Sequence, residues 1–187
     1  MSVNDKLGTR MKTYYEQVPK ARLVRRMPVA IHIDGKAFHT FTKGFKKPFD
    51  EVLIKSMQKT MKYLCENIQG CVLGYTQSDE ITLILVDYKT LESSAWFDYE
   101  VQKMCSISAS MATMAFNRAF EKEIQHFKKT VYYDANGEDQ YAIYEKALEK
   151  GAIGAFCTSI KNHPTPALPI QGGSKVFLQV PDTQESS

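Results

Sequence analysis

Three carboxylates stand at the ends of apolar runs, where acidic side chains can bind a metal ion. Asp34 follows the apolar run 28–33, and Gly35 behind it allows the backbone to bend and a ligand to approach closely. Asp79 and Glu80 follow a second run that is rich in β-forming residues. Because Mg²⁺ prefers oxygen ligands such as carboxylates, these side chains predict a magnesium site if the fold brings them together.

A β-hairpin is the element that would bring the acids together. Residues 71–75 and 81–86 are both typical of strands, and residues 77–80 between them can form a short turn. Two Mg²⁺ ions roughly 3.5–4 Å apart can activate a hydroxyl group and neutralise a leaving phosphate, which is the chemistry of nucleotidyl transfer. Residues 79 and 80 of one extended strand would face opposite sides, so both acids can serve one site only if the chain turns there.

Each motif also has an ordinary interpretation. Asp-Gly is a common turn pair, and Ser-Asp-Glu is typical of a solvated hairpin tip. Their joint position at strand ends, with a helical segment between them, favours the metal site. His32 fits no metal-binding spacing, so we interpret it as a structural residue.

The periodicity of the apolar residues predicts a single α+β domain. The predicted strands are 28–33, 71–75, 81–86 and 151–157, and the predicted helices are 50–67, about 96–127, and 139–150. The order β-α-β-β-α-(α)-β is that of the ferredoxin-like split βαβ plan, an antiparallel sheet with helices on one face. We therefore assign residues 1–160 to this domain, and residues 161–187, with their Pro and Gly residues, to an irregular tail.

Charge and composition limit the class of protein. The net charge is +3, but residues 1–50 hold 11 basic and 4 acidic side chains (11 − 4 = +7), which suits a polyanionic partner. The four cysteines show no C-x-x-C spacing, so the sequence predicts neither a zinc site nor a disulfide framework. No apolar run approaches the roughly 20 residues that span a bilayer. We therefore expect a cytoplasmic protein without a membrane partner.

Two sequence motifs resemble the paired signatures of a known family. The motifs are HIDGKAFHTFTKGFKKPFD at residues 32–50 and GYTQSDE at residues 74–80. They are similar to those of the tRNA-His guanylyltransferases and their guanylyltransferase-like relatives, which add nucleotides to RNA 5′ ends in the 3′→5′ direction. The lead-in RRMPVAIHIDGKAFH and the segment WFDYEVQKM resemble the bacterial and phage guanylyltransferase-like branch. The resemblance runs from about Leu7 to Ala155 and implies the fold of polymerase palms, which agrees with the ferredoxin-like order.

The resemblance implies roles for individual residues. Asp34, the Gly35 carbonyl and Asp79 would bind two Mg²⁺ ions, and Glu80 would be the third catalytic acid. Lys103 and the basic loop of Lys43, Lys46 and Lys47 would hold phosphates as point charges. The loop departs from its relatives at Phe49, where they usually carry Asn. The residues implied to bind the nucleotide are Asp34, Gly35, Lys36, Ala37, Phe38, His39, Lys47, Asp50, Ser78, Asp79 and Lys103.

The same resemblance implies substrates and partners. ATP would activate the 5′ end of a tRNA, GTP or another nucleoside triphosphate would supply the added nucleotide, and the protein would form a homo-oligomer, either a dimer or a tetramer. Relatives continue with an Asp-Ala-Arg strand and with a Trp-Arg-Gln helix tied to tRNA-His identity, and neither is found between Phe156 and Ser187. We therefore expect base pairing at the acceptor end to direct the activity, which amounts to repair of 5′-shortened tRNAs.

Two other functions fit parts of the sequence. A non-catalytic RNA-binding module shares the ferredoxin-like order, and residues 43–45 faintly echo its aromatic strand motif, although Pro48 then leads into a helix. A palm-type nucleotide cyclase would share the metal-binding carboxylates but would not need RNA. Release of pyrophosphate with or without RNA distinguishes a cyclase from a nucleotidyltransferase.

Overall fold

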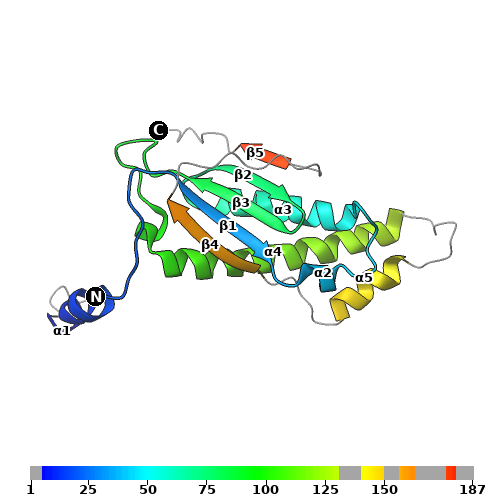
Figure 1. Cartoon of the computed structure of the whole chain (residues 1–187), viewed down its shortest axis with the longest axis horizontal. Coiled ribbons are helices and arrows are strands. Elements are labelled where there is room, and N and C mark those ends of the chain that lie inside the picture. Colours follow the sequence, from blue (N-terminus) through cyan, green and yellow to red (C-terminus); the bar gives the residue numbers. More distant parts are fainter. Residues whose placement is uncertain (1–5, 131–139, 150–155, 163–175, 180–187) are drawn as a thin grey trace.

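The fold is an antiparallel sheet covered by helices on one face. The computed structural model describes residues 6–130, 140–149, 156–162 and 176–179, and Figure 1 shows their arrangement. The helices are α1 (Lys6–Met11), a π-helical turn η1 (Lys12–Glu16), α2 (Phe38–Phe41), α3 (Glu51–Asn67), a 3₁₀ turn η2 (Trp96–Tyr99), α4 (Val101–Thr130) and α5 (Gln140–Glu149). The strands are β1 (Val29–Gly35), β2 (Cys71–Gln77), β3 (Glu80–Leu85), β4 (Phe156–Asn162) and β5 (Val176–Gln179).

The strand order of the sheet is β4-β1-β3-β2-β5, and every neighbouring pair is antiparallel. The first four strands have the order of the ferredoxin-like plan, with β1 and β3 at the centre. This confirms the predicted fold class. It also confirms the predicted hairpin, because β2 and β3 pair directly across a two-residue turn.

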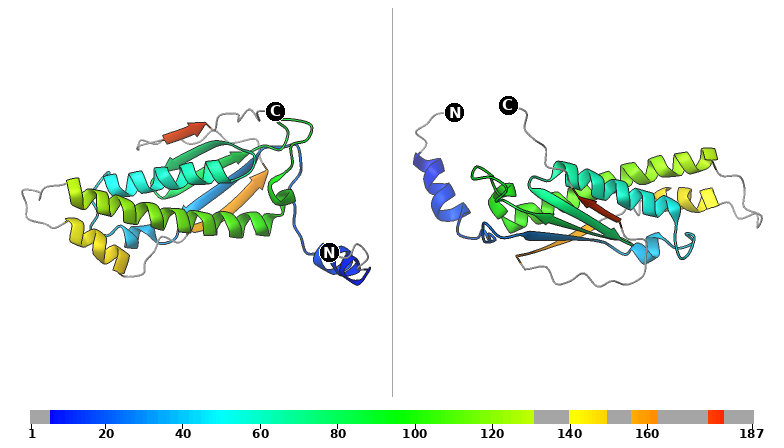
Figure 2. Two further views of the ribbon diagram at one scale, coloured as in Figure 1. Left: turned by 180° about the vertical axis from the view of Figure 1, so that it is seen from behind. Right: turned by 90° about the horizontal axis from the view of Figure 1, so that it is seen from above.

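Alternating side chains in the central strands separate a core face from an open face. Val29, Ile31 and Ile33 of β1 are fully buried, and so are the apolar residues at alternate positions of β3. This face packs against α3 and α4, which lie side by side and cover the sheet from the viewer's side in the left view of Figure 2. On the opposite face, His32 of β1 lies beside Thr82 of β3, with 3.2 Å between Nδ1 and Oγ1. The part of the chain that the structure describes places no helix over this open face.

A cluster of aromatic rings closes the core at the end of the sheet where β1 ends. Phe38 of α2 packs against Phe116 of α4 and Phe156 of β4, with ring centroids 5.3 and 5.4 Å apart. Phe41 and Phe45 extend the cluster toward α5, where Tyr144 meets Phe45 edge-on at 5.0 Å. These contacts hold the segment after β1 against the helices, because offset and edge-on ring pairs add to the stabilisation from burial.

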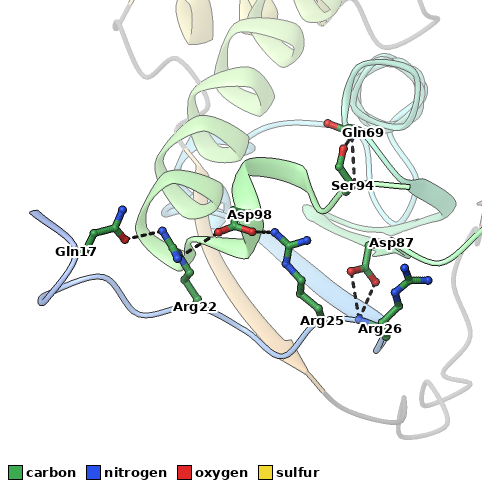
Figure 3. Close-up of polar contacts among 8 residues, drawn as sticks. All are labelled: Gln17, Arg22, Arg25, Arg26, Gln69, Asp87, Ser94 and Asp98. Carbon is green, nitrogen blue, oxygen red and sulfur yellow. Dashed lines mark hydrogen bonds and ion pairs between the residues drawn. The ribbon is translucent and has the colours of Figure 1, made fainter. Parts of the chain in front are cut away.

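The basic lead-in to β1 runs along the loop that precedes α4. Arg22 and Arg25 both form ion pairs with Asp98, and the Arg26 backbone N–H donates to the Asp87 carboxylate at 3.0 Å (Figure 3). Part of the positive charge of the N-terminal third is therefore balanced by acids of the same chain. By contrast, α1 and η1 have no buried residues and lie away from the sheet (Figure 1).

The C-terminal elements differ from their predicted positions. The last strand of the domain was expected at residues 151–157, whereas β4 is Phe156–Asn162 and passes the predicted boundary at 160; residues 151–155 lie outside the described residues. Within the segment predicted to be a largely irregular tail, the structure describes one strand that was not expected, β5, which pairs with β2. Both differences have one cause: strand pairing depends on a distant partner edge, which local composition does not reveal. The rest of the predicted tail lies outside the described residues.

Two further findings bear on the sequence expectations. Cys65, Cys71, Cys105 and Cys157 are free thiols in the structure. Among the helices that the structure describes, none combines the length and the apolar character needed to cross a membrane.

Candidate metal and nucleotide site

The fold brings the three predicted acids to one end of the sheet. Asp34 of β1 is the direct cross-strand partner of Glu80 of β3, and the Gly35 N–H donates to the Asp79 carbonyl at 3.2 Å. Residues directly opposite each other in an antiparallel pair have Cα atoms about 4.5–5.5 Å apart and point to the same face. Asp34 and Glu80 therefore both point to the open face, and Asp79 lies beside them in the turn.

The turn between β2 and β3 frees Asp79 from the alternation of the strand. Ser78 has a left-handed backbone with φ of 54°, and its hydroxyl donates to the Asp79 carboxylate at 2.9 Å. The Thr76 hydroxyl donates to the Glu80 carbonyl at 2.9 Å, which fixes the far side of the turn. Asp79 therefore lies in the turn and not in the strand. Its side chain does not have to point to the face opposite that of Glu80. Ser78, an implied nucleotide ligand, is exposed at the tip.

Gly35 is required by the close approach of an aromatic ring. A Cβ atom at this position would lie 2.4 Å from Cδ2 of Phe38, which is far inside van der Waals contact. Ala37 then takes a left-handed conformation with φ of 55° and begins α2. As a result Lys36, Ala37 and His39 are exposed in the segment that follows Asp34, whereas Phe38 is buried. The implied contact of Phe38 with a nucleotide stays a prediction, because its ring belongs to the core cluster.

Asp50, another implied nucleotide ligand, is buried and holds three donors. Its carboxylate caps α3 by accepting from the Leu53 N–H at 2.9 Å, and it accepts from the Lys46 N–H at 3.1 Å. The third donor is the hydroxyl of Tyr144, at 2.7 Å. Asp50 therefore shapes the loop that carries exposed Lys47. The sequence analysis missed Tyr144, and no local signal could have revealed it because the partner lies 94 residues away.

Lys103 is not brought together with the acids within one chain. It lies in the first turn of α4, where its Nζ is 3.5 Å from Oε2 of Glu100. Phe116 of the same helix is the residue that packs against Phe38 beside Gly35. Thirteen residues separate Lys103 from Phe116 (116 − 103), which corresponds to about 20 Å along a helix at 1.5 Å per residue. The implied role of Lys103 in binding a triphosphate stays a prediction.

The carboxylates suit a metal ion that is shared with a substrate. Within the described ranges, no group of three or more His, Cys, Asp or Glu side chains is placed to hold an ion by itself. Mg²⁺ usually takes only one or two carboxylates and completes its octahedron with waters and substrate phosphates. Asp34 is exposed and Asp79 is half-buried, so both can reach such a shared ion. The donor set fits Mg²⁺ bound together with a nucleotide rather than a closed structural site.

Cys157 is a neighbour of Asp34 that the sequence analysis did not include in the site. Strand β4 places it directly across from Asp34, on the side opposite Glu80, and its side chain is exposed. A thiol is a soft ligand and does not suit Mg²⁺, so we assign it no role in metal binding. A surface hollow of about 420 Å³ lies elsewhere, on α4, and is lined by Glu121, Lys122, Gln125 and His126.

Comparison with known proteins gives consistent matches. The family model described as tRNAHis guanylyltransferase matches residues 8–138. The tRNA(His) guanylyltransferase of Schizosaccharomyces pombe is 32% identical over 111 residues, which are 56% of this chain and 41% of that protein. An uncharacterized protein of Acanthamoeba polyphaga mimivirus is 32% identical over 124 residues, 63% of this chain and 42% of the relative. The chain thus spans about two fifths of the length of these relatives.

Solved structures agree with these matches. A bacterial tRNA(His) guanylyltransferase-like protein in complex with ATP is 36% identical, with a TM-score of 0.64 over 84% of this chain and 58% of that chain. The corresponding complex with GTP has the same TM-score and identity. The enzyme of Saccharomyces cerevisiae, 21% identical with a TM-score of 0.56, supports the fold alone; the match covers 81% of this chain and 57% of that one.

Proposed function

Because the chain belongs to the tRNAHis guanylyltransferase family, we propose that it is a Mg²⁺-dependent nucleotidyltransferase that adds nucleotides to the 5′ end of tRNA in the 3′→5′ direction. The observation that carries this proposal is the meeting of Asp34, Asp79 and Glu80 at one end of the sheet. The likeness to a protein solved with ATP and with GTP supports nucleoside triphosphates as substrates.

The reaction would proceed in two displacements at phosphorus. In the first, an oxygen of the RNA 5′-phosphate attacks the α-phosphorus of ATP, and pyrophosphate leaves. In the second, the 3′-hydroxyl of the incoming nucleoside triphosphate attacks the activated 5′-phosphorus, and AMP leaves. Two bound Mg²⁺ ions would activate the attacking oxygen and neutralise charge on the leaving phosphate.

The residues of this chain would bind and orient the reactants. Asp34, the Gly35 carbonyl and Asp79 would hold the metal ions, and Glu80 would contribute a further acid on the same face as Asp34. Exposed Lys36 would hold phosphates near the carboxylates. The hydroxyl of Ser78, His39 and the backbone at Ala37 would contact the nucleotide, together with Lys47 of the basic loop.

The tRNA specificity is a further part of the proposal. Resemblance of the segments around residues 25–39 and 96–104 to the guanylyltransferase-like branch supports repair of 5′-shortened tRNAs, directed by base pairing at the acceptor end. A homo-oligomer in the cytoplasm remains our expectation for the assembly and the compartment.

One assay tests the function directly. The protein is incubated with Mg²⁺, ATP, a labelled nucleoside triphosphate and a tRNA that lacks its first nucleotide, and label at the 5′ end is measured. We expect incorporation that EDTA abolishes and that occurs on shortened tRNAs of several identities. A strict preference for intact tRNA-His would contradict the repair hypothesis.

The same assay separates the two alternative functions. Release of pyrophosphate from a nucleoside triphosphate without RNA would indicate a nucleotide cyclase. Binding of tRNA without any incorporation would indicate a non-catalytic RNA-binding module. Either result would overturn the proposed transfer reaction.

A further inference from the structure

A buried tyrosine on α5 contacts the centre of the predicted nucleotide loop. Tyr144 is only 2% exposed, and its hydroxyl donates to the carboxylate of Asp50 at 2.7 Å. Helix α5 begins at Gln140, so it lies beyond residues 8–138 that match the family model. The family match therefore says nothing about this contact, and the structure alone indicates what α5 does.

Asp50 connects the contact to the loop that precedes α3. One oxygen of its carboxylate accepts from the Leu53 N–H of the first turn of α3, and the other accepts from the Lys46 N–H of the loop. The oxygen that binds Lys46 is also the one that accepts from Tyr144. A single buried carboxylate thus sets the position of the loop, of the beginning of α3 and of α5.

Helix α5 holds the loop at two further points. The Tyr144 ring meets Phe45 edge-on at 5.0 Å, and the Gln140 side-chain amide donates to the Gly44 carbonyl at 3.4 Å. Gly44 has a left-handed backbone with φ of 93°, and a Cβ atom there would come within 3.2 Å of Ile143. The loop is therefore packed closely against α5 over two consecutive residues.

A series of ring contacts connects the loop to the end of β1, where Asp34 lies. Phe45 contacts Phe41 at 5.6 Å, Phe41 contacts Phe38 at 5.2 Å, and the Phe38 ring covers Gly35 beside Asp34. Because protein interiors are close-packed, a displacement of the loop is transmitted through these rings to Gly35. The exposed lysines of the loop are Lys43, Lys46 and Lys47.

We propose that Tyr144 is a positioning residue for nucleotide binding, which holds the loop 43–50 through Asp50 so that the loop lysines face the triphosphate. The inference rests on the proposed function and deepens it. Tyr144 touches no substrate; it acts through Asp50. The chemistry that the loop recognises is the polyphosphate of a nucleoside triphosphate, because lysines bind phosphate as mobile point charges that need correct placement.

The proton needed for this contact stays on the tyrosine. Burial raises the pKa of the Tyr144 hydroxyl, and the neighbouring Asp50 carboxylate raises it further. The hydroxyl therefore remains a donor across the pH range in which the enzyme would work. Its hydrogen bond is made to the carboxylate of Asp50. Such bonds are stronger than bonds between neutral groups.

The test compares Tyr144→Phe with wild-type protein in nucleotide addition and in nucleotide binding. Loss of the hydroxyl leaves the ring in place, so we expect the KM for the nucleoside triphosphate to rise roughly tenfold, with kcat changed by less than about threefold. The dissociation constant of GTP, measured by calorimetry on the full chain, should rise by the same factor. Tyr88→Phe, an exposed tyrosine after β3, is the control for removal of a hydroxyl, and its KM should stay unchanged.

A second control separates positioning from general loss of stability. Leu85→Val shortens a buried side chain at the opposite end of β3 from the acids, so it should lower the melting temperature without changing the KM. Asp50→Asn keeps an acceptor for the helix cap but removes the charge that Tyr144 binds. In the double variant the rise in KM should be smaller than the product of the two single effects, because both substitutions remove the same interaction. If Tyr144→Phe does not fold, Gln140→Ala removes the other polar contact from α5 to the loop, the one with the Gly44 carbonyl. A raised KM in that variant then supports positioning of the loop by α5, and an unchanged KM overturns the inference.

The outcomes distinguish the inference from the function on which it rests. An active wild-type protein with an unchanged KM in Tyr144→Phe, or with a change that Leu85→Val reproduces, overturns the inference and leaves the proposed function standing. A wild-type protein that neither binds GTP nor adds nucleotides overturns the proposed function and the inference together. A selective rise in KM, absent from both control variants, supports the positioning role.

Discussion

Replacement of Asp34 by Asn is the most direct test of the proposed metal site. Asp34 is exposed at the end of β1, and its backbone pairing with Glu80 and Cys157 does not depend on the side chain. The variant should therefore fold, with a stability within about 0.5 kcal/mol of wild type, as is usual for a surface substitution. Asn keeps the size of the side chain but loses the charge that a hard cation requires.

The expected loss of activity follows from the charge that the ion stabilises. Metal ions contribute several kcal/mol of transition-state stabilisation in phosphoryl transfer. If the variant loses about 3–4 kcal/mol of it, kcat falls roughly 100- to 1000-fold, because each 1.36 kcal/mol is a factor of ten in rate. The loss should be partly offset at high Mg²⁺, since a weaker site fills when the free ion concentration rises.

The assay is single-nucleotide addition to 5′-shortened tRNA over a range of Mg²⁺ concentrations, with circular dichroism as a check of the fold. Asp79→Asn should behave in the same way, because Asp79 lies beside Gly35 in the turn. Glu92→Gln, an exposed acid in the loop before α4, serves as the matched control and should retain wild-type rates. Wild-type rates in Asp34→Asn at low Mg²⁺ would refute the assignment of the metal ions to these carboxylates.

Three further predictions address other parts of the structure. Lys103→Ala should raise the KM for the nucleoside triphosphate with little change in kcat if this lysine holds a phosphate; unchanged steady-state constants would instead make it a surface residue paired with Glu100. Replacing Arg25 and Arg26 together by Ala should make tRNA affinity less dependent on salt. The slope of log affinity against log salt should fall by up to about one unit for each phosphate that the variant no longer neutralises. An unchanged slope in filter-binding titrations would argue against RNA binding by this lead-in. Gly35→Ala should lower the free energy of unfolding by about 1–3 kcal/mol, because the new Cβ meets the Phe38 ring at 2.4 Å; urea melts that match wild type would show that the ring can move away.

Local patterns in the sequence predicted most of the elements. Helix α3 was expected at residues 50–67 and is Glu51–Asn67, with Asp50 as its cap, because apolar spacing and cap chemistry act within one or two turns. The β2–β3 hairpin was likewise predicted from two β-rich runs and a short polar turn. Strand β4 was misplaced and β5 was missed, because an edge strand forms only when a distant strand offers it a free edge.

The candidate site was predictable only in part, for a similar physical reason. The type and position of Asp34, Asp79 and Glu80 predicted a metal site. However, Asp79 and Glu80 are consecutive residues, and in one extended strand their side chains would point to opposite faces. The structure resolves that conflict by placing Asp79 in a turn with Ser78 in a left-handed conformation. Turn geometry of this kind depends on the hydrogen bonds of the whole hairpin, which the motif alone does not specify.

The secondary structure around the site and the chemical identity of its acids follow from the sequence alone, since periodicity, capping and turn formation act between near neighbours. Which of the implied residues meet is settled by the tertiary fold. It pairs Asp34 with Glu80 and leaves Lys103 in the first turn of α4, away from these acids. It also brings the Tyr144 hydroxyl within hydrogen-bond distance of Asp50, although 94 residues separate them in the sequence. These arrangements depend on strand register and helix packing, which bring together side chains that no local pattern connects.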